Sequence, residues 1–572
     1  MVDVETIRQL IHRLRKWEYT WVCLLVIVVL ALHFGIISQP AELVLDEQHY
    51  VPEARAILAG QGTLHPEHPP LGKLFIVAGM QMFGDNPFGW RFFPVIFGAA
   101  GIVFMYLICR RLNLSKKVSY LATFLLALEN LSFVQGGIAM LDVFSLTFTL
   151  AAFWLYLKER YVMSGVVVAL SALAKLSGAL AILVIGLHWL LTGGWTKVWH
   201  RWHLLLRFFT SHKRRWCFPL LFLCNWWLGV ISFSLAIWGM LALFNLGDSF
   251  GLSIIGNDQG LIGILRILGL IFLGVILIDP RQWHFLLWFL TGRRHRWRFL
   301  LWFLNRWRFL LLMLAAPITF VALMPLFDYI IWGEWLNPIT QIQKMISGTG
   351  SIVFTVDTQE TNSIASRPWE WLLPLWYGKL HWQHFLLPYW WTPRYLGMIS
   401  PTVTVFIMPL VIYIIYRAIR GKTDAFLLFA WFFGTYMVWI PASLITDRIS
   451  YLFYFYPTVG AICIGMSIFI FKLLAIARER RRGKLRWFII VVVPLYLLLH
   501  MYAFIIMAPF SIGQTTPPYL GLSFTSESIW WAIPLGLLLY IFTLFYLGIF
   551  KWRGFGDSLT PAANQVDMPP EQ

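Results

Sequence analysis

The sequence has little charge and little cysteine. Asp, Glu, Lys and Arg make up 13% of the 572 residues, about half of the roughly 25% that is usual for soluble domains. The five cysteines lie in or beside apolar segments without the spacing of metal ligands, so we interpret them as small hydrophobic residues. The alternating segments of about ten residues that form an outer-membrane barrel are also missing. These absences exclude a soluble protein, a zinc module and a barrel.

Long apolar runs are what the chain has instead. Hydrophobic residues make up 59% of the sequence, and runs of about 18 or more recur from end to end, which predicts an all-α polytopic membrane protein with about 11–14 transmembrane helices. The net charge of +18 comes from basic clusters between these runs. Such clusters are typical of cytoplasmic loops, so we favour a topological explanation over nucleic-acid binding.

Charge asymmetry also predicts the topology. Four basic residues precede a first predicted span at about 19–38, namely Arg8, Arg13, Arg15 and Lys16. The N-terminus is therefore expected in the cytoplasm and the acidic loop 39–90 outside. No cleavable signal peptide is evident, so the first span is expected to be retained. Within the loop, two short helices at about 52–59 and 71–83 are expected to lie on the membrane surface as external amphipathic helices.

Composition divides the chain into four parts. A segment crowded with Trp, Arg and His separates two transmembrane modules and contains near-repeats such as Arg296-Trp297-Arg298-Phe299-Leu300. We expect it to lie at the interface with anionic headgroups. The polar, Pro-rich tail is expected to be disordered. The predicted parts are an N-terminal catalytic module 1–192, an insertion 193–308, a C-terminal module 309–553 with external loop 333–397, and a tail 554–572.

Residues that can carry chemistry gather in loop 39–90. Leu45-Asp46-Glu47-Gln48-His49-Tyr50 is followed by His68-Pro69-Pro70-Leu71-Gly72-Lys73. Asp46 is either a catalytic base or a helix cap, with Glu47 favouring the helix dipole. His68 and Lys73 form either part of a site or a turn with an interfacial lysine. Asp142 and Lys175, near predicted span ends, are either a structural ion pair or catalytic. From the residues alone these alternatives stay open.

The order of these motifs resembles the protein O-mannosyltransferases, membrane glycosyltransferases of the GT-C fold. A first span, an external Asp-Glu, a surface helix and His-Pro-Pro-Leu-Gly-Lys come in the family's order. The further matches are Trp90-Arg91-Phe92-Phe93-Pro94, Met140-Leu141-Asp142, Ala174-Lys175-Leu176-Ser177-Gly178, Ser366-Arg367-Pro368-Trp369-Glu370-Trp371, and Arg448 with Tyr454-Phe455-Tyr456-Pro457.

The chain also departs from the family. Loop 333–397 has no room for the β-trefoil insertion of the eukaryotic enzymes, which indicates a bacterial or archaeal member. Phe455 replaces a family histidine, and residues 195–308 have no family counterpart that we recognise.

The resemblance implies transfer of mannose, with inversion, from a polyprenyl-phosphate donor to Ser or Thr hydroxyls of exported proteins at the outer face of the plasma membrane. Such a transfer needs one base and cations for the departing phosphate. We predict Asp46 as the base with Glu47 beside it. The predicted phosphate ligands are Lys73, Arg91, Arg448 and Arg367, and the residues predicted to hold the acceptor or support the site are His49, His68, Asp142 and Lys175.

No cofactor beyond the lipid-linked donor is required by the sequence. No ligand cluster compels a metal ion, although the superfamily allows a divalent one. An enzyme of the same fold that modifies a glycolipid or cell-wall glycan, with mannose or another sugar, is the nearest alternative. A transporter or flippase is a remote one, because no inverted repeat of broken helices is evident. The natural acceptor, the lipid length and the oligomeric state stay open.

Overall fold

The computed structural model describes residues 18–193, 308–350, 366–372, 375–376, 379–380, 390–392, 395–447, 449–479, 483–507 and 529–549. Three predicted features therefore lie outside the described residues, together with the predictions made for them: the Trp/Arg-rich insertion except for its first and last residues, the C-terminal tail, and Arg448.

The N-terminal part is a bundle of helices. Its elements are α2 (Thr20–Ile36), α3 (Glu47–Leu58), α4 (Pro70–Phe83), α5 (Pro87–Arg111), α6 (Lys116–Ala127), α7 (Asn130–Gly137), α8 (Leu141–Leu157), α9 (Tyr161–Ala174), the 3-10 turn η1 (Leu176–Ala179) and α10 (Leu180–Leu191). The helix predicted to begin at about residue 52 begins at Glu47, so the Asp-Glu motif lies at its N-terminus. The second loop helix, α4, lies within one residue of its predicted bounds.

The second part continues the bundle. Its helices are α16 (Arg308–Trp332), α17 (Pro338–Gly350), α19 (Pro401–Thr404), α20 (Ile407–Ile419), α21 (Thr423–Phe432), α22 (Trp439–Thr446), α23 (Tyr456–Glu479), α24 (Lys484–Met507) and α25 (Ile529–Leu547). Short helical turns lie at η3 (Pro368–Trp371), η5 (Phe433–Met437) and η6 (Leu452–Phe455). Two small antiparallel pairs join β1 (Leu375–Trp376) to β2 (Lys379–Leu380) and β3 (Trp390–Thr392) to β4 (Tyr395–Gly397).

Six helices of the described part are long and apolar enough to cross a membrane, or seven if α6 and α7, bent by 64°, count as one broken span. Six further apolar helices have 10–17 residues. The prediction of an all-α polytopic membrane protein is confirmed over these residues. The predicted number of spans concerns the whole chain, so the described part does not decide it.

Polar caps explain where several helices begin. The Asn86 side chain accepts the Gly89 N–H at the start of α5, and the Ser115 hydroxyl accepts the Val118 N–H at the start of α6. Glu129 caps α7 after the bend. Such caps satisfy N–H groups that have no partner within the helix. The backbone N–H groups of Leu131 and Ser132, at the start of α7, are therefore hydrogen-bonded despite the break in the helix.

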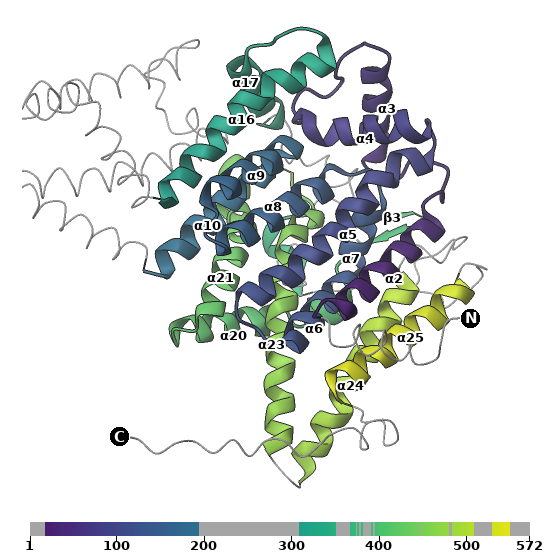
Figure 1. Ribbon diagram of the computed structural model, residues 1–572, viewed down its shortest axis with the longest axis vertical. Helices are drawn as coiled ribbons and strands as arrows, with labels where there is room; N and C mark the ends of the chain where they lie inside the picture. The colour runs from purple at the N-terminus through teal and green to yellow at the C-terminus, as the bar shows by residue number, and fades with distance from the viewer. Residues whose placement is uncertain are drawn as a thin grey trace, which may run out of the picture.

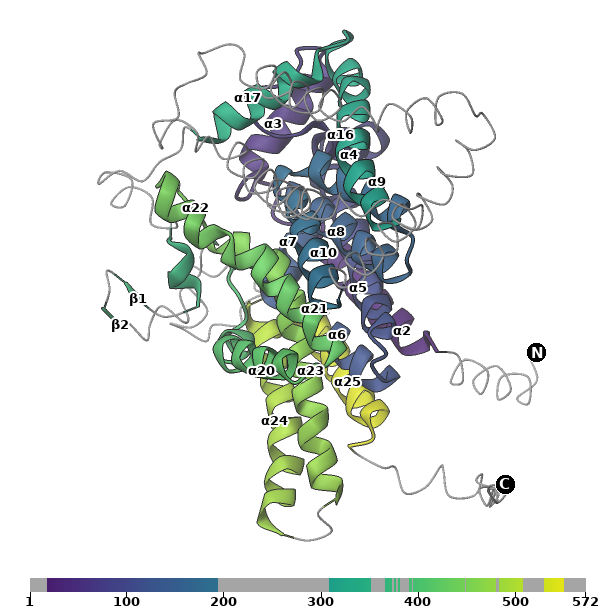
Figure 2. The ribbon, with the colours of Figure 1, turned by 90° about the vertical axis from the view of Figure 1, so that its left-hand side faces the viewer.

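Helix α16 packs along α9, next to α4, so the chain returns from the insertion to the N-terminal bundle (Figure 1). Gly165 of α9 allows this close approach, because a Cβ there would lie 2.6 Å from the Leu312 carbonyl oxygen of α16. Helices α3, α4 and α17 gather at one end of the molecule, and the α23–α24 hairpin projects at the other (Figure 2). The end formed by α3 and α4 carries the candidate site.

Candidate active site

Asp46 lies at the last residue before α3, where the backbone is constrained. Leu45, immediately before it, has a φ of 51°, in the left-handed region that non-glycine residues rarely occupy. Such strain persists only where the surrounding structure enforces it, and it is often found at functional sites. The backbone carbonyl of Asp46 accepts the N–H groups of His49 and Tyr50, which begins the helix.

The Asp46 carboxylate does not cap this helix. It makes no capping hydrogen bond, and among the described residues no hydrogen bond or ion pair reaches it. The side chain is half-buried. Burial raises the pKa of Asp46, the charge of Lys175 opposes this rise, and Asp142 adds to it. The result is an unpaired carboxylate that is more basic than an ordinary aspartate.

Lys175 and Asp142 form an ion pair whose two charges act on Asp46. The Lys175 Nζ lies 2.8 Å from Asp142 Oδ1 and 2.7 Å from Oδ2. The rings of Phe453 and Tyr454, from η6, lie with their centroids 5.1 and 5.8 Å from the same ammonium. Burial alone would lower the pKa of Lys175, but Asp142 and its other neighbours outweigh it and raise the pKa. The ion pair considered as one alternative from sequence is therefore present.

Glu47, next to Asp46 in sequence, has the opposite environment. Its side chain is fully buried. One oxygen accepts Arg91 Nε and the Ala139 N–H, each at 2.8 Å, and the other accepts Arg91 Nη2 at 2.7 Å and the Val44 N–H at 3.0 Å. Both carboxylate oxygens are thus engaged. Glu47 fastens the start of α3 to α5 and to the segment before α8.

Arg91 completes this buried cluster. Its side chain is 0% exposed, and its guanidinium also donates to backbone carbonyls of the segment between α2 and α3. These are Ile37 at 3.2 Å, Gln39 at 3.0 Å, Pro40 at 2.9 Å and Glu42 at 3.3 Å. In this arrangement Arg91 faces protein. Its predicted role as a phosphate ligand stays a prediction, and the geometry favours a different one.

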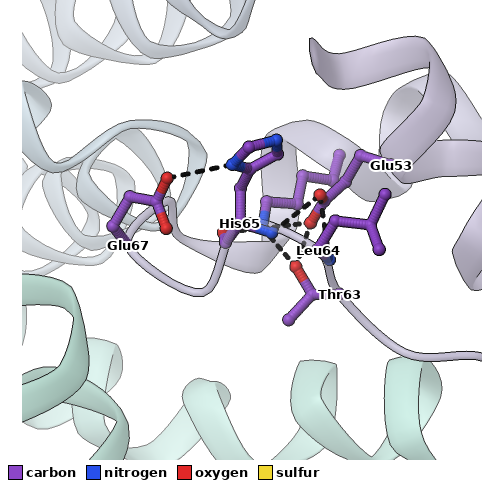
Figure 3. A network of polar contacts seen from close by, with 6 residues as sticks. Glu53, Thr63, Leu64, His65 and Glu67 are labelled. Atoms are coloured by element: carbon purple, nitrogen blue, oxygen red, sulfur yellow. Dashed lines mark hydrogen bonds and ion pairs between the residues drawn. The ribbon is translucent and has the colours of Figure 1, made fainter. Parts of the chain in front are cut away.

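Lys73 of α4 belongs to a second buried cluster, with Glu53 of α3 and the loop between the two helices; Figure 3 shows Glu53 with Thr63, Leu64 and His65 of that loop. The Lys73 ammonium donates to Glu53 Oε1 at 2.6 Å, Thr63 Oγ1 at 2.7 Å and the His65 carbonyl at 2.6 Å. Because an ammonium has three donors, Lys73 is fully engaged. Glu53 also accepts the Thr63 hydroxyl and the N–H groups of Leu64 and His65 at 3.0 and 2.9 Å. The cluster holds the loop that joins α3 to α4.

The histidines lie around the outside of this loop. The ring of His49 meets His65 edge-on at 5.4 Å between centroids, and the ring of His68 meets Tyr50 in the same way at 5.4 Å. The His65 ring turns away from Glu53 toward Glu67, with Nδ1 3.1 Å from Oε1 (Figure 3). His49 contributes to the electrostatic surroundings of Asp46. Of the predicted support residues, His49, Asp142 and Lys175 thus contribute to the electrostatic surroundings of Asp46.

Arg367 comes from the second part of the chain. Its guanidinium lies 2.7 Å from Asp447 Oδ1 and donates to the Ser443 hydroxyl at 3.1 Å. The Arg367 side chain is 18% exposed, and that of Asp447 is 64% exposed. The turn η3 that follows Arg367 lies near the aromatic rings around Lys175, because the ring centroid of Trp371 lies 6.4 Å from that of Tyr454. Of the four predicted phosphate ligands, Arg448 lies outside the described residues.

Sequence reasoning missed two aromatic neighbours of the site. The pKa of Tyr50 rises because the side chain is buried and faces Asp46, Asp142 and Tyr454. The signal for Tyr50 was available, because it lies four residues after Asp46 and therefore on the same helix face. Tyr454 lies far away in sequence and only the fold brings it here. In the part of the chain that the structure describes, no group of three or more His, Cys, Asp or Glu side chains could hold a metal ion.

Comparison with known proteins finds a family match over part of the chain. Residues 22–246 match the model of the family described as dolichyl-phosphate-mannose-protein mannosyltransferase. The resemblance inferred from the motifs is therefore confirmed over this part, which includes Asp46 and the helices α3 to α10 but is less than half of the chain. The motifs around Arg367 and Tyr454 lie beyond the match.

Two curated relatives are similar to part of this chain. A polyprenol-phosphate-mannose–protein mannosyltransferase of Mycobacterium tuberculosis is 34% identical over 157 residues, which cover 26% of this chain and 30% of the relative. One of Corynebacterium glutamicum is 32% identical over 163 residues, covering 25% and 31%. The matched part thus spans about a third of these relatives. An oligosaccharyltransferase of Archaeoglobus fulgidus has a TM-score of 0.43 at 15% identity, covering 86% of this chain and 55% of its own.

Proposed function

We propose that the protein is a membrane glycosyltransferase of the GT-C type that transfers mannose from a polyprenyl-phosphate donor to Ser or Thr hydroxyls of exported proteins, with inversion. The observation that carries this proposal is the unpaired, half-buried carboxylate of Asp46 next to the strained Leu45. The family match over residues 22–246 and the names of the relatives support the donor and the acceptor.

Asp46 performs the proton transfer in this proposal. Its carboxylate takes the proton of the acceptor hydroxyl while that oxygen forms a bond to the anomeric carbon of mannose. The bond from that carbon to the donor phosphate breaks, and its electron pair leaves with the phosphate. A raised pKa suits a general base, since basicity near the working pH favours proton abstraction. The geometry of Asp46 fits this task because no neighbour occupies its oxygens.

The four predicted phosphate ligands have two different roles in this proposal. Arg91 and Lys73 form buried ion pairs with Glu47 and Glu53, so we assign these two cations to holding the loop around Asp46 in place. Arg367 remains as a phosphate ligand, together with Arg448. The ion-pair partner of Arg367 is Asp447, which is 64% exposed; an ion pair with an exposed member is weak, so a phosphate could replace Asp447.

The site faces the outside of the plasma membrane in this proposal. The opposite end of α5 carries Arg110 and Arg111, and α6 begins there with Lys116 and Lys117. Basic residues at span ends are retained on the cytoplasmic side. Asp46, at the other end of the bundle, then faces outward, where exported acceptors pass.

Asp46→Asn tests the proposal. We expect transfer of labelled mannose from a polyprenyl-phosphate donor to a Ser/Thr peptide to fall by about 10²–10⁴-fold, the usual contribution of a general base. Asp85→Asn is the matched control, because Asp85 forms an exposed ion pair with Arg55 in the same loop and should retain activity. Turnover by Asp46→Asn within a few-fold of the wild type would remove Asp46 as base.

The acceptor is tested separately. The purified wild-type protein is given the same donor with a Ser/Thr peptide, with a glycolipid, or with water alone. Product on the peptide is expected. Product on the glycolipid alone would replace the proposed acceptor and leave the role of Asp46 intact.

A further inference from the structure

Helices α21 and α22 join through the π-turn η5 into one span, Thr423–Thr446 (Figure 2). A π-turn closes its hydrogen bonds to the fifth residue instead of the fourth. Such turns are rare and are frequently found at functional sites. Gly434 lets this wide turn pack closely on α10, because a Cβ there would lie 2.6 Å from Val184 Cγ2. The proposed transfer assigns no role to the π-turn.

Tyr436, in this π-turn, bonds to the turn that carries Arg367. Its side chain is fully buried, and its hydroxyl donates to the Pro368 carbonyl at 2.9 Å. Pro368 directly follows Arg367 and begins η3. Farther along the same span, the Ser443 hydroxyl accepts Arg367 Nη1 at 3.1 Å. One membrane span therefore contacts this turn twice, at its backbone and at its guanidinium.

The rest of the turn is also held by hydrogen bonds. The Ser366 N–H donates to the Ser450 carbonyl at 2.9 Å, and the Ser450 hydroxyl donates to the Ser366 carbonyl at 2.7 Å. The Arg367 N–H donates to Glu370 Oε2 at 2.8 Å, and the Arg367 carbonyl accepts the Glu370 N–H at 3.0 Å. Because proline has no N–H, every backbone donor and acceptor of residues 366–368 is engaged. These bonds fix the point from which the Arg367 side chain extends.

The other end of Arg367 has a different environment. Its Nη2 lies 2.7 Å from Asp447 Oδ1, and the Asp447 side chain is 64% exposed. A fixed backbone with an exchangeable partner at the charged end suits a group that receives a ligand, because supporting residues must hold such a group in its productive geometry.

We propose that Tyr436 is a positioning residue that, together with Ser450 at the other end of the turn, holds the backbone of Arg367 so that the guanidinium meets the donor phosphate. This inference rests on the proposed function, because it concerns the phosphate ligand of that reaction. It assigns Tyr436 and its π-turn a part in donor binding that is exerted through Arg367.

Tyr436→Phe is the first test, because it removes only the hydroxyl. The KM for the polyprenyl-phosphate-mannose donor should rise about 2–10-fold, the usual worth of one hydrogen bond, while kcat stays near the wild-type value. Tyr540→Phe is the matched control, because the Tyr540 hydroxyl also donates to a proline carbonyl, that of Pro494, at 2.9 Å. The control should keep the wild-type KM. If the donor KM of Tyr436→Phe equals that of Tyr540→Phe, Tyr436 is merely structural and the proposal is overturned.

The double variant Tyr436→Phe/Arg367→Met shows whether the two residues act together. If Tyr436 acts through Arg367, removal of the guanidinium leaves Tyr436 nothing to position. The donor KM of the double variant should then equal that of Arg367→Met alone. Effects on the donor KM that multiply would show that Tyr436 acts independently of Arg367, and would overturn the proposal.

A second variant serves if Tyr436→Phe does not fold. Ser450→Ala loosens the same turn from its other end and should raise the donor KM only when Arg367 is present; an unchanged KM would overturn the proposal. Failure of the proposed function shows in other variants. An active Asp46→Asn removes the base, whereas an unchanged donor KM in Arg367→Met removes the phosphate ligand and overturns this inference with it.

Discussion

Asp46 and Glu47 are neighbours in sequence and opposites in structure. Glu47 is buried, with its two oxygens taken by Arg91 and two backbone N–H groups, whereas no described residue pairs with the Asp46 carboxylate. The same contrast separates the cations: Arg91 and Lys73 are sealed in buried pairs, whereas Arg367 is partly exposed. In the proposed function, the Asp-Glu motif thus contains one residue that takes the proton, Asp46, and one that holds the start of α3 in place, Glu47.

Arg91→Met should have the largest effect on stability. The substitution leaves the buried Glu47 without its cation, and breaking a buried pair in this way costs about 3–5 kcal/mol. Activity is lost together with folding. Thermal unfolding in detergent measures the effect, and the double variant Glu47→Gln/Arg91→Met should recover part of the loss. A stable Arg91→Met that still transfers mannose, with a raised donor KM, would instead return Arg91 to the phosphate.

Lys73→Met should be destabilising by a smaller amount, about 3 kcal/mol. Glu53 loses its ammonium but still accepts the Thr63 hydroxyl and the N–H groups of Leu64 and His65. The loop between α3 and α4 should loosen first, which limited proteolysis of the loop can measure. Lys344→Met, on the exposed face of α17, is the control. Equal stability of Lys73→Met and the wild type would contradict a holding role.

Arg367→Met should affect donor binding more than stability. The Arg367 side chain is 18% exposed, but its ion-pair partner Asp447 is 64% exposed, and a pair with an exposed member contributes little folding energy. A charge-assisted bond to phosphate is worth about 1.5–3 kcal/mol, so the KM for the donor should rise about tenfold or more. Asp447→Asn should leave the KM unchanged or lower it. A lost kcat with an unchanged KM in Arg367→Met would contradict a phosphate role.

The sequence was informative about local features and their order. Apolar runs predicted the helical membrane fold, and the acidic loop with its two short helices was placed correctly between the first span and α5. The start of α3 was predicted five residues too late, because Pro52 was taken as its first residue, whereas it lies inside the helix. A proline is tolerated early in a helix, so it marks the first turns without fixing the first residue.

The roles of the charged residues could not be predicted in the same way. Glu47 and Arg91 are 44 residues apart, and Glu53 and Lys73 are 20 apart. A motif shows that an arginine and a carboxylate are present, but only the fold decides whether they neutralise each other or face a ligand. Tyr454 meets Lys175 for the same reason, because η6 and the end of α9 are neighbours only in space.

The most direct test of the contrast is to measure unfolding and single-turnover transfer in Asp46→Asn and Glu47→Gln side by side. An unpaired, half-buried charge contributes desolvation cost and no bond, so Asp46→Asn should unfold at or above the wild-type temperature and lose mannose transfer. Glu47→Gln should unfold at a clearly lower temperature. An Asp46→Asn protein that transfers mannose at a rate near that of the wild type, or that loses as much stability as Glu47→Gln, would contradict the assignment of Asp46 as the base.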